Sequence, residues 1–174
     1  MASTMFVEEG SFNPTLTQLW CASRRLRMMT EKARVLFLCT HNSARSQMAE
    51  GLLRHLAGDR FEARSAGTEA THVRPLANRA MEEVGIDISG QESKTLERYL
   101  QEPFDNVITV CDDANEACPF FPGAQSRLHW SFEDPSKAEG SEEERLAVFR
   151  SVRDRIRDRI EDDLVATDEV MPTS

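Results

Sequence analysis

The residues of this chain best suited to chemistry are Cys39, Arg45 and Ser46, which lie within one short segment. Four apolar residues, 35–38, run into the cysteine, and five small or polar residues separate it from the arginine and serine. A guanidinium is a permanently charged, two-pronged donor for oxyanions, and an ionised thiol is a strong nucleophile. The spacing therefore predicts a nucleophilic cysteine beside a bound tetrahedral anion. It does not fit a Walker-type nucleotide loop, because the terminal Gly-Lys-Ser/Thr is missing.

The neighbouring residues indicate a strand, a loop and a helix around this segment. The apolar run 35–38 is typical of a buried parallel strand, and apolar residues recur at helical spacing from Arg45 onward. Backbone N–H groups and the helix dipole at such a junction favour an anion. We expect this field to lower the pKa of Cys39 and keep it as thiolate. The predicted anion-binding residues are Thr40, His41 (in a shaping role), Asn42, Ser43, Ala44, Arg45 and Ser46.

The alternative to a nucleophilic Cys39 is a buried cysteine with a purely structural role. Cysteine is among the most buried residue types, and a lone cysteine at a strand end is more often inert packing than a nucleophile. The arginine and serine at fixed spacing after it favour the functional reading.

Two further cysteines, Cys111 and Cys118, lie in the second half of the chain. A predicted strand at 106–110 ends directly before Cys111, so parallel strands would bring this thiol and Cys39 to one rim of the sheet. The spacing of Cys111 and Cys118 fits neither a Cys-x-x-Cys redox pair nor a zinc site. The polar, acidic residues between them favour a mobile loop with a reactive thiol over two buried structural thiols.

A carboxylate follows the last predicted strand in the segment 132–135. On the same rim, Asp134 could serve as general acid for a departing oxygen. The alternative is that Asp-Pro simply begins a turn.

The remaining sequence predicts one α/β domain. Strands at 35–39, 61–67, 106–110 and 127–130 alternate with helices at 45–56, 75–84, 93–100 and 141–164. This order indicates a central parallel sheet of about four strands with helices on both faces. The last helix has a Ser141–Glu144 capping box and an expected surface pair, Arg150 with Asp154. We expect a poorly ordered extension at 1–30, a single catalytic domain at 31–165 and a disordered tail at 166–174.

Composition narrows the partners of the 174-residue chain. Its net charge of -9 disfavours nucleic acid and anionic membranes, and no apolar run approaches the ~18 residues of a membrane span. Four widely spaced cysteines, Cys21 among them, suit a reducing cytoplasm better than a disulfide framework. A monomer is expected.

The chain resembles the thioredoxin-coupled arsenate reductases, which have the fold of the low-molecular-weight tyrosine phosphatases. The resemblance extends from about residue 33 to 160 and is carried by residues 38–50, 65–68, 109–112, 118–119 and 129–135. Ala44 and Ser136 support it, because phosphatases of this fold commonly have a second cysteine and a tyrosine at these positions.

The resemblance implies a relay of three cysteines and no cofactor. Cys39 attacks arsenate held by the loop and Arg45, while Asp134 protonates the departing oxygen; phosphate is a competing anion. Cys111 then attacks Cys39, which releases arsenite and leaves a Cys39–Cys111 disulfide. Cys118 resolves that disulfide, and thioredoxin reduces the resulting Cys111–Cys118 disulfide.

The resemblance also bears on metals. Some relatives hold a potassium ion with groups matching Asn42, Glu50 and Ser65. Here Lys94 stands where those relatives place a carboxylate, so we expect its ammonium to replace the cation and predict no metal.

Three alternatives stay open at this point. They are a phosphatase acting on phosphotyrosine or small phosphoesters, a glutaredoxin-coupled reductase, and a non-catalytic oxyanion sensor.

Overall fold

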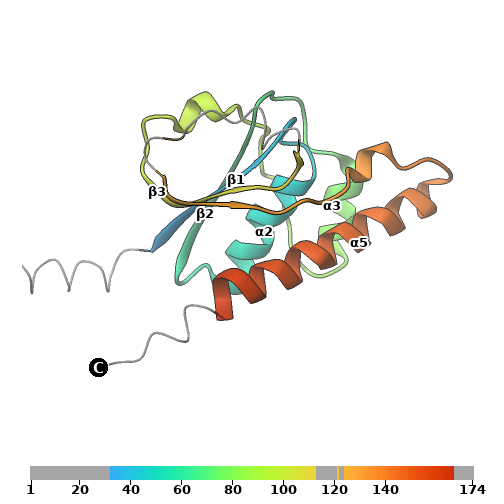
Figure 1. Cartoon of the computed structure of the whole chain (residues 1–174). Helices are drawn as coiled ribbons and strands as arrows, with labels where there is room; N and C mark the ends of the chain where they lie inside the picture. The colour runs from blue at the N-terminus through green and yellow to red at the C-terminus, as the bar shows by residue number, and fades with distance from the viewer. Residues whose placement is uncertain (1–31, 113–120, 122–123, 167–174) are drawn as a thin grey trace, which may run out of the picture. The chain divides into compact units, whose positions relative to one another are not determined.

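The structure is a computed structural model that describes residues 32–112, 121 and 124–166 (Figure 1). The residues outside these ranges include the predicted extension at 1–30 with Cys21, the relay cysteine Cys118, and residues 167–174 of the predicted tail. The domain boundaries therefore stay a prediction. Every helix among the described residues is too short or too polar to span a lipid bilayer.

A four-stranded parallel sheet forms the centre of the described chain, as predicted. Its strands are β1 (Ala33–Cys39), β2 (Phe61–Gly67), β3 (Phe104–Thr109) and β4 (Ala124–His129), in the order β2-β1-β3-β4. The chain therefore leaves β1 toward one side to form β2 and returns on the other side as β3. In such sheets the crevice beyond the carboxyl ends of the strands, where the order reverses, is the usual ligand site. Here that crevice lies between β1 and β3.

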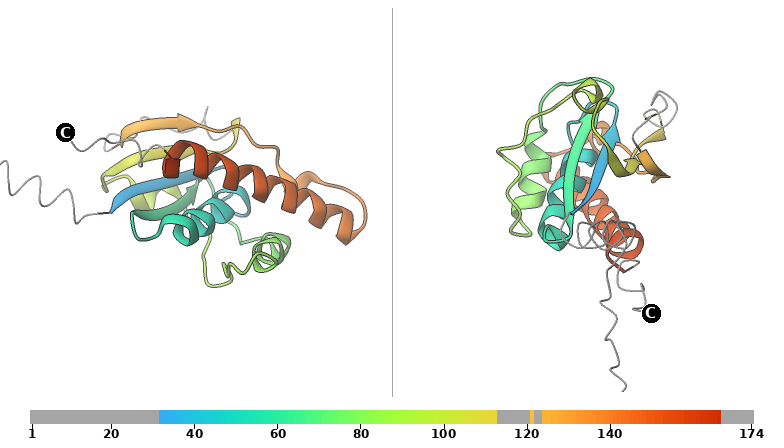
Figure 2. Two further views of the ribbon diagram at one scale, coloured as in Figure 1. Left: turned by 90° about the horizontal axis from the view of Figure 1, so that it is seen from below. Right: turned by 90° about the vertical axis from the view of Figure 1, so that its left-hand side faces the viewer.

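Alternate residues of β1 face two separate apolar layers, which explains the unbroken run at 35–38. Val35 and Phe37 join the core formed with α2 (Arg45–Ala57), α3 (Pro75–Glu82) and α5 (Glu142–Ile160). Leu36 and Leu38 face the opposite core, which is closed by the 3-10 helix η1 (Leu96–Tyr99). Helices thus cover both faces unequally, with the long helices on one side (Figure 2).

The helices differ from prediction mainly at their ends. The capping box of Ser141 and Glu144 starts α5 as predicted, and a π-helical turn, η3 (Glu161–Val165), follows it. The predicted helix at 93–100 is only the single turn η1, because the Ser93 side chain bonds to the loop after β1 and to Thr71 instead of capping a helix. The helix predicted at 75–84 ends two residues early, at Glu82, and Val84 beyond it is 38% exposed.

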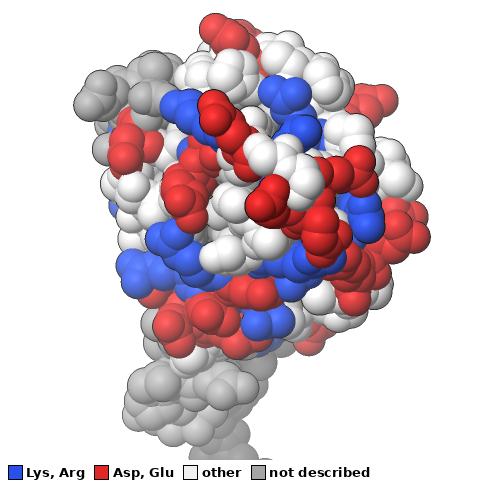
Figure 3. Space-filling view, turned by 90° about the vertical axis from the view of Figure 1, so that its right-hand side faces the viewer, with Lys and Arg blue, Asp and Glu red and all other residues white. Residues whose placement is uncertain are grey.

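Ion pairs join α3 to α5 at one end of the domain. Arg150 donates to both carboxylate oxygens of Glu83 at 2.6 and 2.7 Å, and Arg79 to Glu142 at 2.6 Å. The expected pair of Arg150 with Asp154 is therefore wrong, because the longer reach to α3 offers a two-pronged partner. Acidic and basic side chains are interspersed over this face in Figure 3.

Candidate active site

The loop after β1 is shaped by Asn42, whose side chain is fully buried and whose φ of 45° lies in the left-handed region. Its amide nitrogen donates to the hydroxyls of Ser46 and Ser65 at 2.9 and 3.0 Å. Its amide oxygen accepts from Gln47 Nε2 and the Lys94 backbone N–H, both at 2.8 Å. Four hydrogen bonds from one side chain thus fix the loop to α2, β2 and the segment before η1.

The carbonyl oxygens of this loop are bonded to the segments around it. Those of Cys39 and Thr40 accept the backbone N–H groups of Thr68 and Glu69 at 3.2 and 2.8 Å, and Ser93 Oγ donates to that of His41 at 3.0 Å. Because the carbonyls are held there, the loop can offer N–H groups to a guest: the Asn42 N–H points to Cys39 Sγ at 3.1 Å. These N–H groups and the helix dipole suit an anion.

Close packing beneath the loop requires glycine at position 67. A Cβ added to Gly67 would lie 2.6 Å from the Thr40 carbonyl oxygen and 2.8 Å from the Asn42 nitrogen. The turn after β2 therefore supports the loop through its backbone. At the start of α2, Ala44 provides no side-chain cap, so no cap competes with a guest for the first N–H groups of the helix.

The thiol of Cys39 is buried, and it lies 2.9 Å from Ser46 Oγ. Burial raises the pKa of Cys39 above its ordinary value, while the hydrogen bond with Ser46 and the charge of Arg45 oppose that rise. The predicted lowering of this pKa is therefore wrong in direction. The sequence indicated the loop field and the arginine, whereas the desolvation depends on how completely the fold encloses the sulfur.

Arg45 and Asp134 meet beside the loop. Arg45 donates to Asp134 Oδ2 and to the Phe132 carbonyl oxygen, both at 3.0 Å. The other oxygen of Asp134 accepts the Ser136 N–H at 3.0 Å and caps the short helix η2 (Pro135–Lys137). Asp134 thus begins a turn and also pairs with Arg45 beside the loop. Its role as general acid stays a prediction. An anion on Arg45 would compete with this carboxylate.

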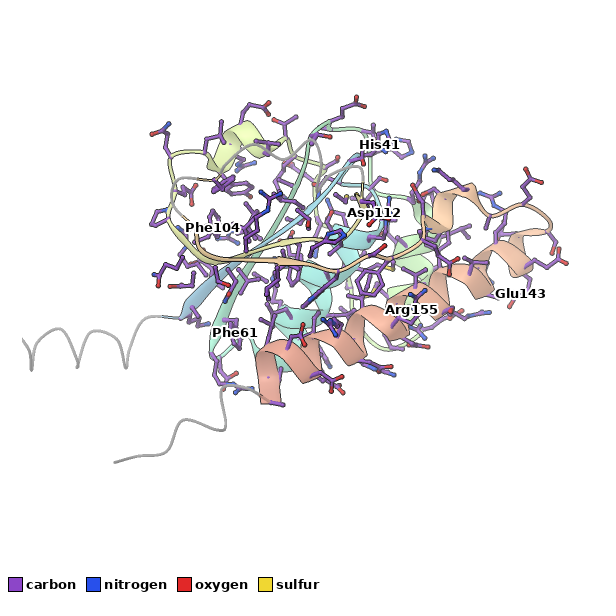
Figure 4. All side chains as sticks on the ribbon, in the orientation of Figure 1. His41, Phe61, Phe104, Asp112, Glu143 and Arg155 are labelled. Atoms are coloured by element: carbon purple, nitrogen blue, oxygen red, sulfur yellow. The ribbon has the colours of Figure 1, made fainter. Side chains whose placement is uncertain are left out.

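The second predicted thiol, Cys111, lies at the same rim as Cys39. Leu38 of β1 pairs with Thr109 of β3, and the Val110 N–H donates to the Leu38 carbonyl at 2.8 Å. Cys111 is 2% exposed, and its sulfur lies 3.5 Å from Thr40 Oγ1. Both cysteines are free thiols. His41 and Asp112, labelled in Figure 4, lie at this end of the sheet, and Cys118 is outside the described residues.

Of the three residues expected to match a potassium site, Glu50 is paired with cationic side chains of this chain. Glu50, whose side chain is 4% exposed, accepts Ser65 Oγ at 2.5 Å and lies 3.6 Å from Lys94 Nζ. Its other oxygen pairs with Arg54 at 2.5 Å. A cavity of about 510 Å³ borders Glu50 and Lys94 but not the thiols. In the described part of the chain, no three His, Cys, Asp or Glu side chains gather as metal ligands.

Sequence reasoning missed Gln47, which is fully buried next to the loop. Its amide nitrogen donates to the Asn42 carbonyl and side-chain oxygens at 3.0 and 2.8 Å, and to the Glu92 carbonyl at 2.8 Å. A polar residue in the first turn of α2, directly after Ser46, was the available signal.

Fold and geometry together are those of an α/β protein suited to hold a tetrahedral oxyanion against a cysteine at a strand-to-helix junction. Residues 34–168 match the model of the low molecular weight phosphotyrosine protein phosphatases, and the chain belongs to this family.

Several similar proteins within this family are named arsenate reductases. A protein of Halalkalibacterium halodurans named arsenate reductase is 52% identical over 126 residues, which cover 72% of this chain and 91% of that protein. A solved structure described as an arsenate reductase in the phosphate binding state is 38% identical, with a TM-score of 0.68, and covers 78% of this chain and 98% of its own. A thioredoxin-dependent arsenate reductase of Corynebacterium glutamicum is 28% identical with a TM-score of 0.57, covering 87% and 75%.

Proposed function

We propose that this chain reduces arsenate to arsenite. The observation that carries the proposal is the presence of two free thiols, Cys39 and Cys111, at one rim beside an anion loop. The high identity to a protein named arsenate reductase supports the substrate. A relative described in a phosphate binding state supports a tetrahedral oxyanion as the guest, with phosphate as competitor.

In the first step, the sulfur of Cys39 forms a bond to arsenic and displaces one oxygen. That oxygen leaves as water: it is protonated through Asp134, and the proton lost by the thiol balances the one gained by the water. Arsenate takes the place of Asp134 on Arg45, whose guanidinium, together with the loop N–H groups, holds the remaining oxygens. Because burial raises the pKa of Cys39, the thiol gives up its proton as its sulfur attacks arsenic.

In the second step, the thiol of Cys111 attacks the sulfur of Cys39. A disulfide forms, the sulfur–arsenic bond breaks, and its electron pair stays on arsenic, which passes from As(V) to As(III). The two thiols lose the two electrons that arsenic gains. The Cys111 proton and protons from water complete arsenite.

Turnover then requires an external dithiol. We propose that Cys118 attacks Cys111 to free Cys39, and that thioredoxin reduces the Cys111–Cys118 disulfide by thiol–disulfide exchange. A relative named a thioredoxin-dependent arsenate reductase supports this partner. The reaction would take place in the cytoplasm.

The test follows arsenate-dependent NADPH oxidation with thioredoxin and thioredoxin reductase, and in parallel with glutaredoxin, glutathione and glutathione reductase. We expect consumption with the thioredoxin system alone. Cys118→Ser should release one arsenite per enzyme and then stop. Full turnover by this variant would exclude the relay, and no arsenite from the unmodified chain would exclude the function.

A phosphatase is the second candidate, and the family match favours it. It predicts steady hydrolysis of a phosphoester such as para-nitrophenyl phosphate that survives Cys111→Ser and is lost in Cys39→Ser. We expect hydrolysis far slower than arsenate reduction.

A further inference from the structure

A cluster of hydrogen bonds holds the residue that follows Cys111. Asp112 Oδ1 lies 2.9 Å from His129 Nε2, and Asp112 Oδ2 accepts the Ser131 hydroxyl at 3.1 Å. The other ring nitrogen of His129 lies 2.8 Å from Thr109 Oγ1. We call Asp112, His129 and Ser131 the Asp112 clasp. It ties the chain just beyond β3 to the last residue of β4 and to Ser131 after it.

The partners of His129 orient its ring. When Thr109 donates to Nδ1, the proton of a neutral imidazole lies on Nε2 and bonds to Asp112. When the imidazole is protonated, the Thr109 hydroxyl can turn to the Leu128 carbonyl, 3.4 Å away, and Nε2 still donates to Asp112. The clasp is therefore satisfied in both charge states.

The charged groups around Asp112 all favour its carboxylate form. Hydrogen bonds from Ser131 and His129 lower the pKa of Asp112, and the charges of His129 and Arg45 act in the same direction. Asp112 thus stays an acceptor for two donors at neutral pH. The Asp112 side chain is 70% exposed, so water can replace its hydrogen bonds when the clasp opens.

We propose that Asp112 is a positioning residue that keeps the Cys111 thiol turned toward the Cys39 loop. The inference rests on the proposed function, because it concerns the step in which Cys111 attacks the Cys39–arsenic adduct and arsenic takes the electron pair. β3 ends at Thr109, so strand pairing does not extend to Cys111 itself. The clasp supplies a second anchor, one residue past the sulfur, that keeps this thiol 2% exposed beside Thr40.

The first experiment needs no arsenate. The full chain, with its thiols reduced, is treated with iodoacetamide, and the alkylation rate of each cysteine is followed by peptide mass spectrometry. Asp112→Ala removes both hydrogen bonds of the clasp. Each bond changes the equilibrium between the closed and the open clasp about threefold, so Cys111 should be alkylated about tenfold faster. The rate at Cys39 is the internal reference and should not change.

Three variants separate the clasp from a general loss of fold. Asp112→Asn can accept from His129 and donate to Ser131, so it should stay near the unmodified rate. Ser131→Ala removes one bond from the opposite side and should give about threefold faster alkylation of Cys111. Asp158→Asn makes the same charge change at an exposed carboxylate of α5, which pairs with Arg157, and should have no effect.

The second readout is arsenite released in a single turnover without thioredoxin, measured by rapid quench. Asp112→Ala should slow release about tenfold while the dissociation constant for phosphate stays unchanged, and Asp112→Asn should restore the rate. Equal Cys111 alkylation in Asp112→Ala and the unmodified chain would overturn the inference. Absence of arsenite from the unmodified chain would instead overturn the proposed function, and the alkylation rates would still decide on the clasp.

Discussion

Replacing Asn42 tests the account of the loop most directly, because one buried side chain fixes it in a left-handed conformation. Asn42→Ala removes four hydrogen bonds, each worth about 1 kcal/mol net. Alanine at a φ of 45° adds about 1 kcal/mol. We therefore expect Asn42→Ala to lower the free energy of unfolding by about 5 kcal/mol.

Asn42→Gly separates the two contributions. Glycine loses the same four bonds but adopts the left-handed region freely, so its loss should be about 4 kcal/mol. The assay is urea unfolding followed by circular dichroism at neutral pH, with linear extrapolation to water. The order of stability should be unmodified chain, then Asn42→Gly, then Asn42→Ala.

A second asparagine provides the matched control. Asn78 lies in α3, where its side-chain oxygen is buried without a hydrogen-bond partner. Asn78→Ala removes that unpaired group and improves helix propensity, so its effect should be within about 1 kcal/mol and stabilising. A loss below about 2 kcal/mol in Asn42→Ala, or a glycine variant less stable than the alanine variant, would refute the reasoning.

Three further outcomes follow from the site. The melting temperature of the unmodified chain should be equal in KCl and NaCl, whereas Lys94→Gln should melt higher in KCl, because Glu50 loses the ammonium 3.6 Å away; equal melting of the variant in both salts would count against this. Asp134→Ala should bind phosphate several-fold tighter by calorimetry, since Arg45 loses a competing carboxylate, yet reduce arsenate turnover by about 10²–10⁴-fold. Because burial raises the folded-state pKa of Cys39, the unfolded thiol ionises first, near pH 8.5, and stability should fall from there upward. Urea midpoints of Cys39→Ser should fall less over that pH range.

The parts of the fold that follow local pattern were predictable from the sequence. The apolar run 35–38 indicated a central buried strand. The helix predicted at 141–164 corresponds to α5 and η3, which bury Leu146, Phe149, Val152, Ile156, Ile160 and Leu164. The shared rim of Cys39 and Cys111 followed from a topological rule, since parallel strands bring their carboxyl ends together.

What could not be predicted depends on contacts distant in sequence. Arg150 chooses Glu83, 67 residues away, over a partner one turn along its own helix. The clasp joins Asp112 to His129 across the ends of two strands. The rise in the pKa of Cys39 could not be predicted either, because it depends on all the residues, distant in sequence, that bury the sulfur.

Because β1 and β3 are neighbours in the sheet, related sequences can gain or lose residues in some segments but not in others. Thr40 and Cys111 are 71 residues apart, yet they are brought together by strands that lie about 4.8 Å from each other. Insertions in the connections that leave and rejoin these strands leave that separation intact. One residue added within β3 would instead turn Cys111 to the opposite face of the sheet. A search for distant relatives should therefore fix the number of residues from each strand to its cysteine and leave the intervening lengths free.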